Sequence, residues 1–164
     1  MDVRDCITRD IERASAHQRI AEVLLGSRAE TTYGEDYRYD VRMVDGTTLE
    51  FKTDDKAFKS HNIAIEIKGN KGQDSGLSTT LADYWIHLAL DTLHEGTSTY
   101  AIYQFQPIEL QRLISHLEAH TVTACEGSTI ALLPMSRIEG YRVGCATVKN
   151  GRMISISIDT SYYY

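Results

Sequence analysis

The chain contains little proline and little cysteine, and it has no long apolar run. Its 164 residues include two prolines, and no stretch reads as a low-complexity linker or an internal repeat. With 42% hydrophobic residues, the chain can bury one core, so we expect a single domain over residues 1–164. No apolar run approaches the ~20 residues that span a bilayer, which predicts no membrane segment.

The cysteines are odd in number, far apart in the sequence and without a Cys-x-x-Cys pair. They indicate a reduced chain with free thiols rather than a disulfide framework. The N-terminus, MDVRDCITRD, is charged from its second residue, which is not typical of a signal peptide. We therefore expect a cytoplasmic protein.

The net charge of −6 argues against a protein that coats nucleic acid through bulk electrostatics. The lysines are nevertheless concentrated, because five of the six lie within twenty residues: Lys52, Lys56, Lys59, Lys68 and Lys71. Asp54, Asp55 and Glu66 lie among them. This segment is either a solvated face or a local edge that binds phosphate.

Hydrophobic periodicity predicts a mixed α/β arrangement, in which a central β-sheet is flanked by helices. Apolar residues at helical spacing predict a helix over residues 5–25, and Gly26 is a plausible stop. A second helix is predicted over 107–120, with Pro107 in its first turn. Strands are predicted near residues 37–44, 47–53, 62–68, 82–90, 98–105, 129–135, 145–150 and 153–159.

The stretch YDVRMVDGTTLEFKTD, residues 39–54, reads as a β-hairpin that contains Asp40 and Glu50. A two-residue loop would place these carboxylates on opposite faces of the sheet. A three-residue loop with Gly46 in the left-handed conformation would place them directly opposite each other.

Amphipathicity favours the three-residue loop, because only that register separates polar from apolar side chains. One face then carries Arg38, Asp40, Arg42, Thr48, Glu50 and Lys52, and the other carries Tyr39, Val41, Met43, Thr47, Leu49 and Phe51. Opposed Cβ atoms lie roughly 5 Å apart, so the two carboxylates would repel. Either a hard cation such as Mg²⁺ neutralises them, or the neighbouring basic residues do so on a solvated face.

An Asp, a short hairpin and then Glu-x-Lys resembles the core motif of the PD-(D/E)XK nucleases, the restriction-endonuclease-like superfamily. The spacing is similar to that of phage and archaeal Holliday-junction resolvases. DIERASAHQRIAEVLLG, KTDDKAFKSHNIAIE and SGLSTTLADYW also look like segments of small phage-borne members. The resemblance covers roughly residues 10–90, and Tyr39 stands where the superfamily name has proline.

The resemblance implies a restriction-endonuclease-like fold and a Mg²⁺-dependent endonuclease, often dimeric, that hydrolyses duplex or branched DNA, with Mn²⁺ as a substitute. Asp40 and Glu50 would hold the metal, with the Phe51 carbonyl as an additional ligand. Lys52 would orient the attacking water or stabilise charge. The family also places a glutamate on the preceding helix, for which Glu12 is the first choice and Glu22 the alternate.

Glu66 is a further candidate, because Asp54 or Asp55 followed by Glu66-Ile67-Lys68 also spells Asp…Glu-x-Lys. The residues between them do not read as a strand and tight turn. If strand 62–68 adjoins strand 47–53, Glu66 could face the same cleft as a metal ligand or water-positioning group. A solvated sheet face is the alternative.

Two other features have ordinary explanations. Residues 75–80 could hold a phosphate, although a flexible loop explains them as well, and Trp85 reads as a core residue. No motif for serine or cysteine hydrolases is present.

The competing function is a non-catalytic protein of the same fold that binds nucleic acid or another protein.

Overall fold

A computed structural model describes residues 3–30, 39–117, 119–124 and 126–159, with the side chains of the first helix described from residue 13 onward. Its helices are α1 (Val3–Leu25), α2 (Ala57–Ser60) and α3 (Pro107–His116), with 3-10 turns η1 (Gly76–Ser78), η2 (Met135–Arg137) and η3 (Glu139–Tyr141). None of the helices in these ranges is both long and apolar enough to cross a membrane.

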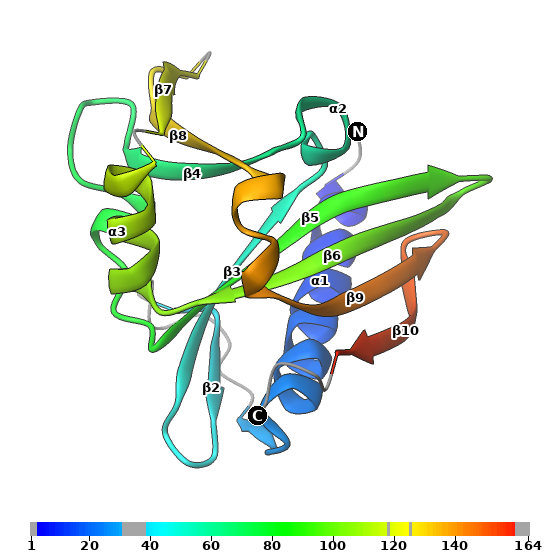
Figure 1. Cartoon of the computed structure of the whole chain (residues 1–164). Coiled ribbons are helices and arrows are strands. Elements are labelled where there is room, and N and C mark those ends of the chain that lie inside the picture. Colours follow the sequence, from blue (N-terminus) through cyan, green and yellow to red (C-terminus); the bar gives the residue numbers. More distant parts are fainter. Residues whose placement is uncertain (1–2, 31–38, 118, 125, 160–164) are drawn as a thin grey trace.

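A seven-stranded mixed sheet forms the centre of the molecule (Figure 1). Its strands, in spatial order, are β1 (Ala29–Glu30), β2 (Val41–Met43), β3 (Thr48–Asp54), β5 (Tyr84–His94), β6 (Thr97–Phe105), β9 (Arg142–Lys149) and β10 (Arg152–Ile158). β3 and β5 run parallel, and the other neighbours are antiparallel. The predicted mixed sheet with flanking helices is therefore present.

A second, antiparallel sheet contains β4 (Asn62–Lys68), β8 (Thr129–Pro134) and β7 (His120–Thr123) in that order. β4 has the predicted bounds, but it pairs with β8 and does not adjoin β3. The predicted helix over 107–120 also ends early, at His116, and β7 begins at His120. Strand alternation identifies a strand, but it does not identify the partner with which that strand pairs.

The two faces of the seven-stranded sheet each bury a core. On one face, Ile20 and Leu24 of α1 pack against Met43, Leu49 and other strand residues. On the other face, the second sheet and α3 cover a core that includes Ile65, Trp85, Phe105, Leu110 and Leu133. Three layers result, and polar residues of β3 that point away from α1 lie in the space beneath the second sheet.

The hairpin has the predicted three-residue loop. Val41 pairs with Leu49, and the Met43 N–H donates to the Thr47 carbonyl at 2.8 Å. Gly46 has φ +91°, the left-handed conformation that this turn requires. Val41, Met43, Leu49 and Phe51 are buried, so the predicted separation of faces holds for the described residues.

The N-terminal part of the predicted strand 37–44 falls mainly on residues that lie outside the described ranges. β2 begins at Val41, so Asp40 immediately precedes the strand. The short strand β1 was not predicted, because two residues carry no recognisable alternation. Helix α1 agrees closely with the prediction, and Gly26, with φ +60°, follows its last residue.

Candidate functional site

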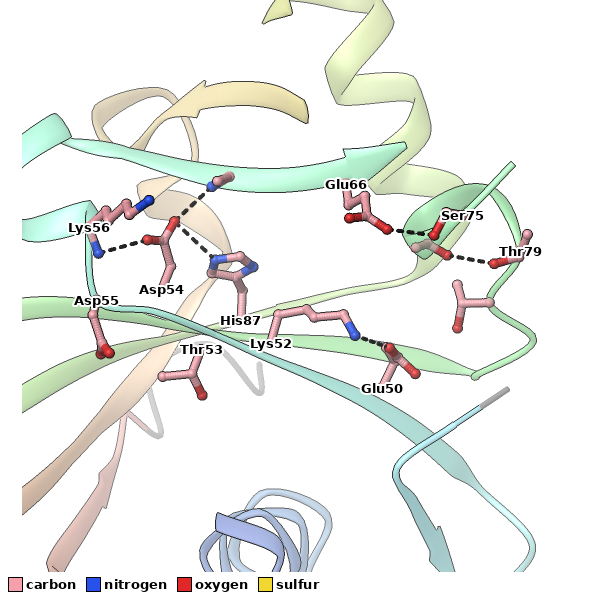
Figure 2. Close-up of a pocket in the computed structure, with 13 residues that line it drawn as sticks. Glu50, Lys52, Thr53, Asp54, Asp55, Lys56, Glu66, Ser75, Thr79 and His87 are labelled. Atoms are coloured by element: carbon pink, nitrogen blue, oxygen red, sulfur yellow. Dashed lines mark hydrogen bonds and ion pairs between the residues drawn. The ribbon is translucent and has the colours of Figure 1, made fainter. Parts of the chain in front are cut away.

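A cleft of about 780 Å³ lies between β3 and β5 on one side and β4 with the loop 75–80 on the other (Figure 2). Most of the described residues that line it are of polar or charged types. They are Glu50, Lys52, Thr53, Asp54, Asp55, Lys56, Ala64, Glu66, Ser75, Gly76, Thr79, Thr80 and His87. Three of the five predicted catalytic residues, Glu50, Lys52 and Glu66, are therefore brought together.

Glu50 and Lys52 lie on the same face of β3 because side chains alternate along a strand. Glu50 is 9% exposed, and its Oε1 accepts a hydrogen bond from the Lys52 ammonium. That ammonium also lies 5.6 Å from the centre of the Trp85 ring, within cation–π range. Burial raises the pKa of Glu50 above its ordinary value, the nearby charge of Asp40 adds to this, and Lys52 acts in the opposite direction.

Asp40 lies close to Glu50 along the hairpin but does not line the cleft. Continuing the observed register by one residue places it opposite Glu50, as predicted. Its Oδ2 accepts a hydrogen bond from the backbone N–H of Phe51 at 2.7 Å, so the carboxylate binds the backbone of β3. The Phe51 side chain points toward α1, where its ring stacks on His17 with centroids 4.5 Å apart.

His17 is the titratable group beneath β3 on the α1 side. Burial lowers its pKa to about 4, the charge of Asp40 acts against this, and the charges of Arg13 and Lys52 lower it further. The imidazole is therefore neutral at physiological pH. It supports Phe51 as an uncharged stacking partner.

Asp54 joins the two sheets at the other end of the cleft. Its Oδ1 accepts hydrogen bonds from the backbone N–H groups of Lys56, at 2.9 Å, and Ala57, at 3.1 Å. Its Oδ2 accepts one from the Ala64 N–H of β4 at 2.9 Å. This carboxylate, which sequence analysis considered only as part of a second Asp…Glu-x-Lys pattern, therefore holds β3, α2 and β4 together.

His87 is a buried residue of the cleft that sequence analysis did not single out. It is 1% exposed, its Nε2 lies 3.8 Å from Asp54 Oδ2, and its Nδ1 accepts a hydrogen bond from Trp85 Nε1 at 3.4 Å. Burial lowers the pKa of His87, against the influence of Asp54. Alternation in YWIHLAL places Trp85 and His87 on one face, and this was the available signal.

Burial alone would raise the pKa of Asp54, but its partners outweigh burial. His87 and the backbone N–H groups of Ala64 and Lys56 together lower the pKa of this carboxyl. Asp54 is therefore ionised, and both of its carboxylate oxygens accept hydrogen bonds. It is a group that organises the cleft, because every one of its contacts is to the protein framework.

Glu66 faces the cleft from β4, although β4 does not adjoin β3 as the prediction had supposed. Its Oε1 accepts a hydrogen bond from the Ser75 hydroxyl. Gly76 has φ +53°, and a Cβ there would lie 2.4 Å from the Glu66 carbonyl oxygen, so glycine is required for this close approach.

The glycine-rich loop is held in place rather than flexible. The Ser78 hydroxyl donates to the Ile67 carbonyl at 2.8 Å, and Gln111 of α3 donates to the Leu77 carbonyl at 3.3 Å. Leu77 is buried. The loop therefore forms a fixed wall of the cleft, with Ser75 and Thr79 facing the interior (Figure 2).

The two candidate helix acids have different outcomes. Glu12 lies within α1, but its side chain is outside the part of the chain that the structure describes. Glu22 accepts a hydrogen bond from the Ala29 N–H at 3.0 Å. Because this contact secures the segment after α1, and Glu22 does not line the cleft, it has a structural role.

Acidic groups outnumber basic ones in the cleft. Glu50, Asp54, Asp55 and Glu66 face Lys52 and Lys56, while His87 is neutral. Within the described ranges, no three His, Cys, Asp or Glu side chains gather closely enough to form a metal centre by themselves. The arrangement can nevertheless offer carboxylate oxygens, a lysine ammonium and hydroxyl groups to one ligand.

No protein-family model matches the chain, and no significant match was found among curated proteins or solved structures. Arguments about function therefore depend on the geometry of the cleft.

Proposed function

We propose that the protein is a Mg²⁺-dependent nuclease of restriction-endonuclease-like fold that hydrolyses phosphodiester bonds in DNA. The observation that carries the proposal is the position of Glu50 and Lys52. They lie on one face of β3 at the floor of a polar cleft, with Asp40 next to them along the hairpin and Glu66 on the opposite wall. An antiparallel hairpin followed by a parallel strand, with α1 on one face, supports the proposed fold.

The charge of the cleft supports a requirement for a cation. Four carboxylates against two lysines would repel a phosphodiester, and burial already raises the pKa of Glu50. Carboxylate oxygens suit Mg²⁺, which uses one or two carboxylates together with substrate phosphates. Glu50 and Asp40, which the hairpin register places opposite each other, would hold the ion, with the Phe51 carbonyl as the further candidate ligand. When bound, Mg²⁺ supplies Lewis-acid stabilisation of charge on the phosphate.

The remaining roles belong to side chains of the cleft. Lys52 would donate hydrogen bonds to the attacking water or to a phosphate oxygen, once a cation replaces it beside Glu50. Glu66, held by Ser75, would orient a water on the opposite side. Asp54 and His87 would keep the two walls at a fixed separation, because Asp54 links β3 to β4.

The test is cleavage of labelled linear duplex, single-stranded and four-way-junction DNA with Mg²⁺, Mn²⁺ or EDTA. We expect metal-dependent cleavage that falls by about 100-fold or more in Lys52→Ala, as on removal of a group that stabilises transition-state charge. Lys149→Ala is the matched control, since Lys149 is an exposed lysine at the end of β9. Both variants should unfold at the wild-type urea concentration.

A non-catalytic protein of the same fold, which binds nucleic acid or another protein, is the second candidate. The hydrogen bond between Lys52 and Glu50 favours it, because the two charges already neutralise each other. The binding-protein hypothesis would replace the nuclease hypothesis if no substrate is cut and titration with Mg²⁺ or Mn²⁺ releases no heat. Cleavage that Lys52→Ala leaves intact would instead place the chemistry elsewhere.

A further inference from the structure

The exposed aromatic residue Phe58 lies in α2, the short helix at one end of the cleft. Phe58 is 41% exposed, and it is the one aromatic residue among the exposed large hydrophobic side chains in the described part of the chain. Lys56 and Lys59 lie on either side of it in the sequence, and both are exposed. We name this group, Lys56, Phe58 and Lys59, the α2 platform.

The α2 platform is fixed relative to the proposed catalytic residues. Asp54 accepts hydrogen bonds from the backbone N–H groups of Lys56 and Ala57 at the start of α2, and Ala57 is fully buried. At the other end, His61, in the left-handed conformation, donates its N–H to the Ala57 carbonyl at 2.8 Å. Because these contacts leave the helix little freedom, Phe58 is held at the surface by the backbone.

The two lysines of the platform have no acidic partner. In the ranges that the structure describes, neither Lys56 nor Lys59 takes part in a salt bridge. The acids beside them are engaged elsewhere, because Asp54 binds backbone N–H groups and Asp55 accepts a hydrogen bond from the Tyr100 hydroxyl at 2.8 Å. Both ammonium groups are therefore available to phosphates.

The platform is continuous with the cleft. Lys56 lines the cleft and immediately precedes α2, and it lies four residues from Lys52, a span of no more than about 14 Å along the chain. Among the described residues that line the cleft there is no Phe, Tyr or Trp, so this lining offers polar groups but no surface for stacking a base. The exposed ring of Phe58, two residues after Lys56 in the chain, would supply such a surface.

The dimensions of the cleft favour one strand over two. A volume of about 780 Å³ is that of a small-molecule site, and the wall formed by β4 and the loop 75–80 faces Glu50 and Lys52 directly. We infer that the backbone of one strand fits such a space and that a base-paired duplex does not. Proteins that bind single strands combine basic side chains with aromatic stacking surfaces in this way.

We propose that the α2 platform binds single-stranded nucleic acid, with a base stacked on Phe58 and neighbouring phosphates on Lys56 and Lys59. When a cation occupies the cleft, the strand continues from the platform into it; without the cation, binding is confined to the platform. The inference rests on the proposed function in one respect, which is that the bound strand is the substrate. Binding itself requires no cleavage, so it is measured separately.

The first experiment measures binding of labelled oligothymidylate by fluorescence anisotropy in EDTA, where no metal-dependent cleavage occurs. We expect Phe58→Ala to weaken binding by about tenfold, the loss typical of one aromatic stacking surface, and Phe58→Tyr to restore it. Val44→Ala is the control, because Val44 is an exposed apolar residue in the turn at the opposite end of β3. Equal affinity of Phe58→Ala and wild type would overturn the proposal.

The second experiment uses tryptophan fluorescence as a direct report of stacking. The single natural tryptophan, Trp85, is fully buried, so Phe58→Trp introduces an exposed indole against a nearly constant background. Oligothymidylate should quench this indole, and should leave the indole of Val44→Trp unchanged. Saturating oligonucleotide without any quenching of Phe58→Trp would show that no base stacks there.

Two further probes define the ligand. Oligouridylate in place of oligothymidylate shows whether the single strand is RNA or DNA, and binding of either one through Phe58 supports the proposal. Stronger binding of a blunt duplex, unaffected by Phe58→Ala, would contradict it.

The proposal for the α2 platform and the proposal for the nuclease can be contradicted independently of each other. Binding that depends on Phe58, without cleavage in Mg²⁺, would support the platform and remove the nuclease. Cleavage with no role for Phe58 in binding would support the nuclease and remove the platform.

Discussion

Glu50 and Asp54 are carboxylates on the same strand, on the same face and in the same cleft, yet their environments act in opposite directions. The pKa of Glu50 is raised, chiefly by burial. The pKa of Asp54 is lowered, because hydrogen-bonding partners outweigh its burial. Two carboxylates four residues apart therefore differ, because the fold disfavours the ionised form of Glu50 and favours the ionised form of Asp54.

The difference lies in the partners. Asp54 accepts hydrogen bonds from three backbone N–H groups and lies 3.8 Å from buried His87. Glu50 contacts the ammonium of Lys52, a flexible side chain that is 41% exposed. Backbone donors cannot move away, whereas an ammonium can be exchanged for a metal ion. The comparison indicates a structural role for Asp54 and leaves Glu50 as the candidate for the proposed chemistry.

Replacing Asp54 should have the largest effect on stability. Asp54→Ala leaves three backbone N–H groups without their acceptor and His87 without its charged neighbour, so we expect the free energy of unfolding to fall by about 3–5 kcal/mol. Urea unfolding followed by circular dichroism measures it. Asp55→Ala is the control, because it loses one exposed hydrogen bond, to Tyr100, and should cost about 1 kcal/mol or less. Similar losses in the two variants would contradict the structural role of Asp54.

Replacing Glu50 should separate activity from stability. In Glu50→Gln we expect cleavage to fall by about 100-fold or more, because the charge that would hold the metal is lost. The free energy of unfolding should change by less than about 1 kcal/mol, since Lys52 can turn to solvent and a buried charge is removed. Destabilisation as large as that of Asp54→Ala would make Glu50 a structural residue as well.

The pH dependence of stability should be the smallest effect, and it should have opposite signs at the two sites. Because the folded pKa of Glu50 is raised, its ionisation costs stability as pH rises above 4.5, so Glu50→Gln gains on wild type over that range. Because the folded pKa of Asp54 is lowered, its contribution is present above pH 3.8 and is lost as pH falls through the folded pKa. The disadvantage of Asp54→Asn should therefore shrink in acid.

Urea unfolding at a series of pH values measures both trends. If the stability of Glu50→Gln relative to wild type instead falls as pH rises, the effect of Lys52 on the pKa of Glu50 is larger than that of burial. An Asp54→Asn variant with the same deficit below pH 3 and at pH 6 would show that hydrogen-bond geometry, rather than charge, accounts for its effect.

Local patterns predicted the hairpin well. Asp45-Gly46 and the alternation of polar and apolar side chains fixed the loop length, and the structure has Val41 opposite Leu49 as that register requires. The same alternation placed Glu50 and Lys52 on one face. These features depend on residues near one another in the chain, so the sequence contains the information directly.

The partners of β4 were not predicted. β4 was identified residue for residue, but its neighbour, β8, lies more than sixty residues later in the chain. Glu66 nevertheless faces the cleft, because the second sheet folds over the first rather than extending it. The role of His87 was missed for a related reason, since its contact with Asp54 joins β5 to the end of β3.

The sequence by itself determined the elements, the register of the hairpin and the face on which Glu50 and Lys52 lie. Only the tertiary structure decided that β4 and the loop 75–80 form the opposite wall, that Asp54 holds the two sheets together and that Phe58 is exposed. The physical reason is that strand periodicity specifies which way a side chain points, whereas pairing between distant strands specifies what it meets.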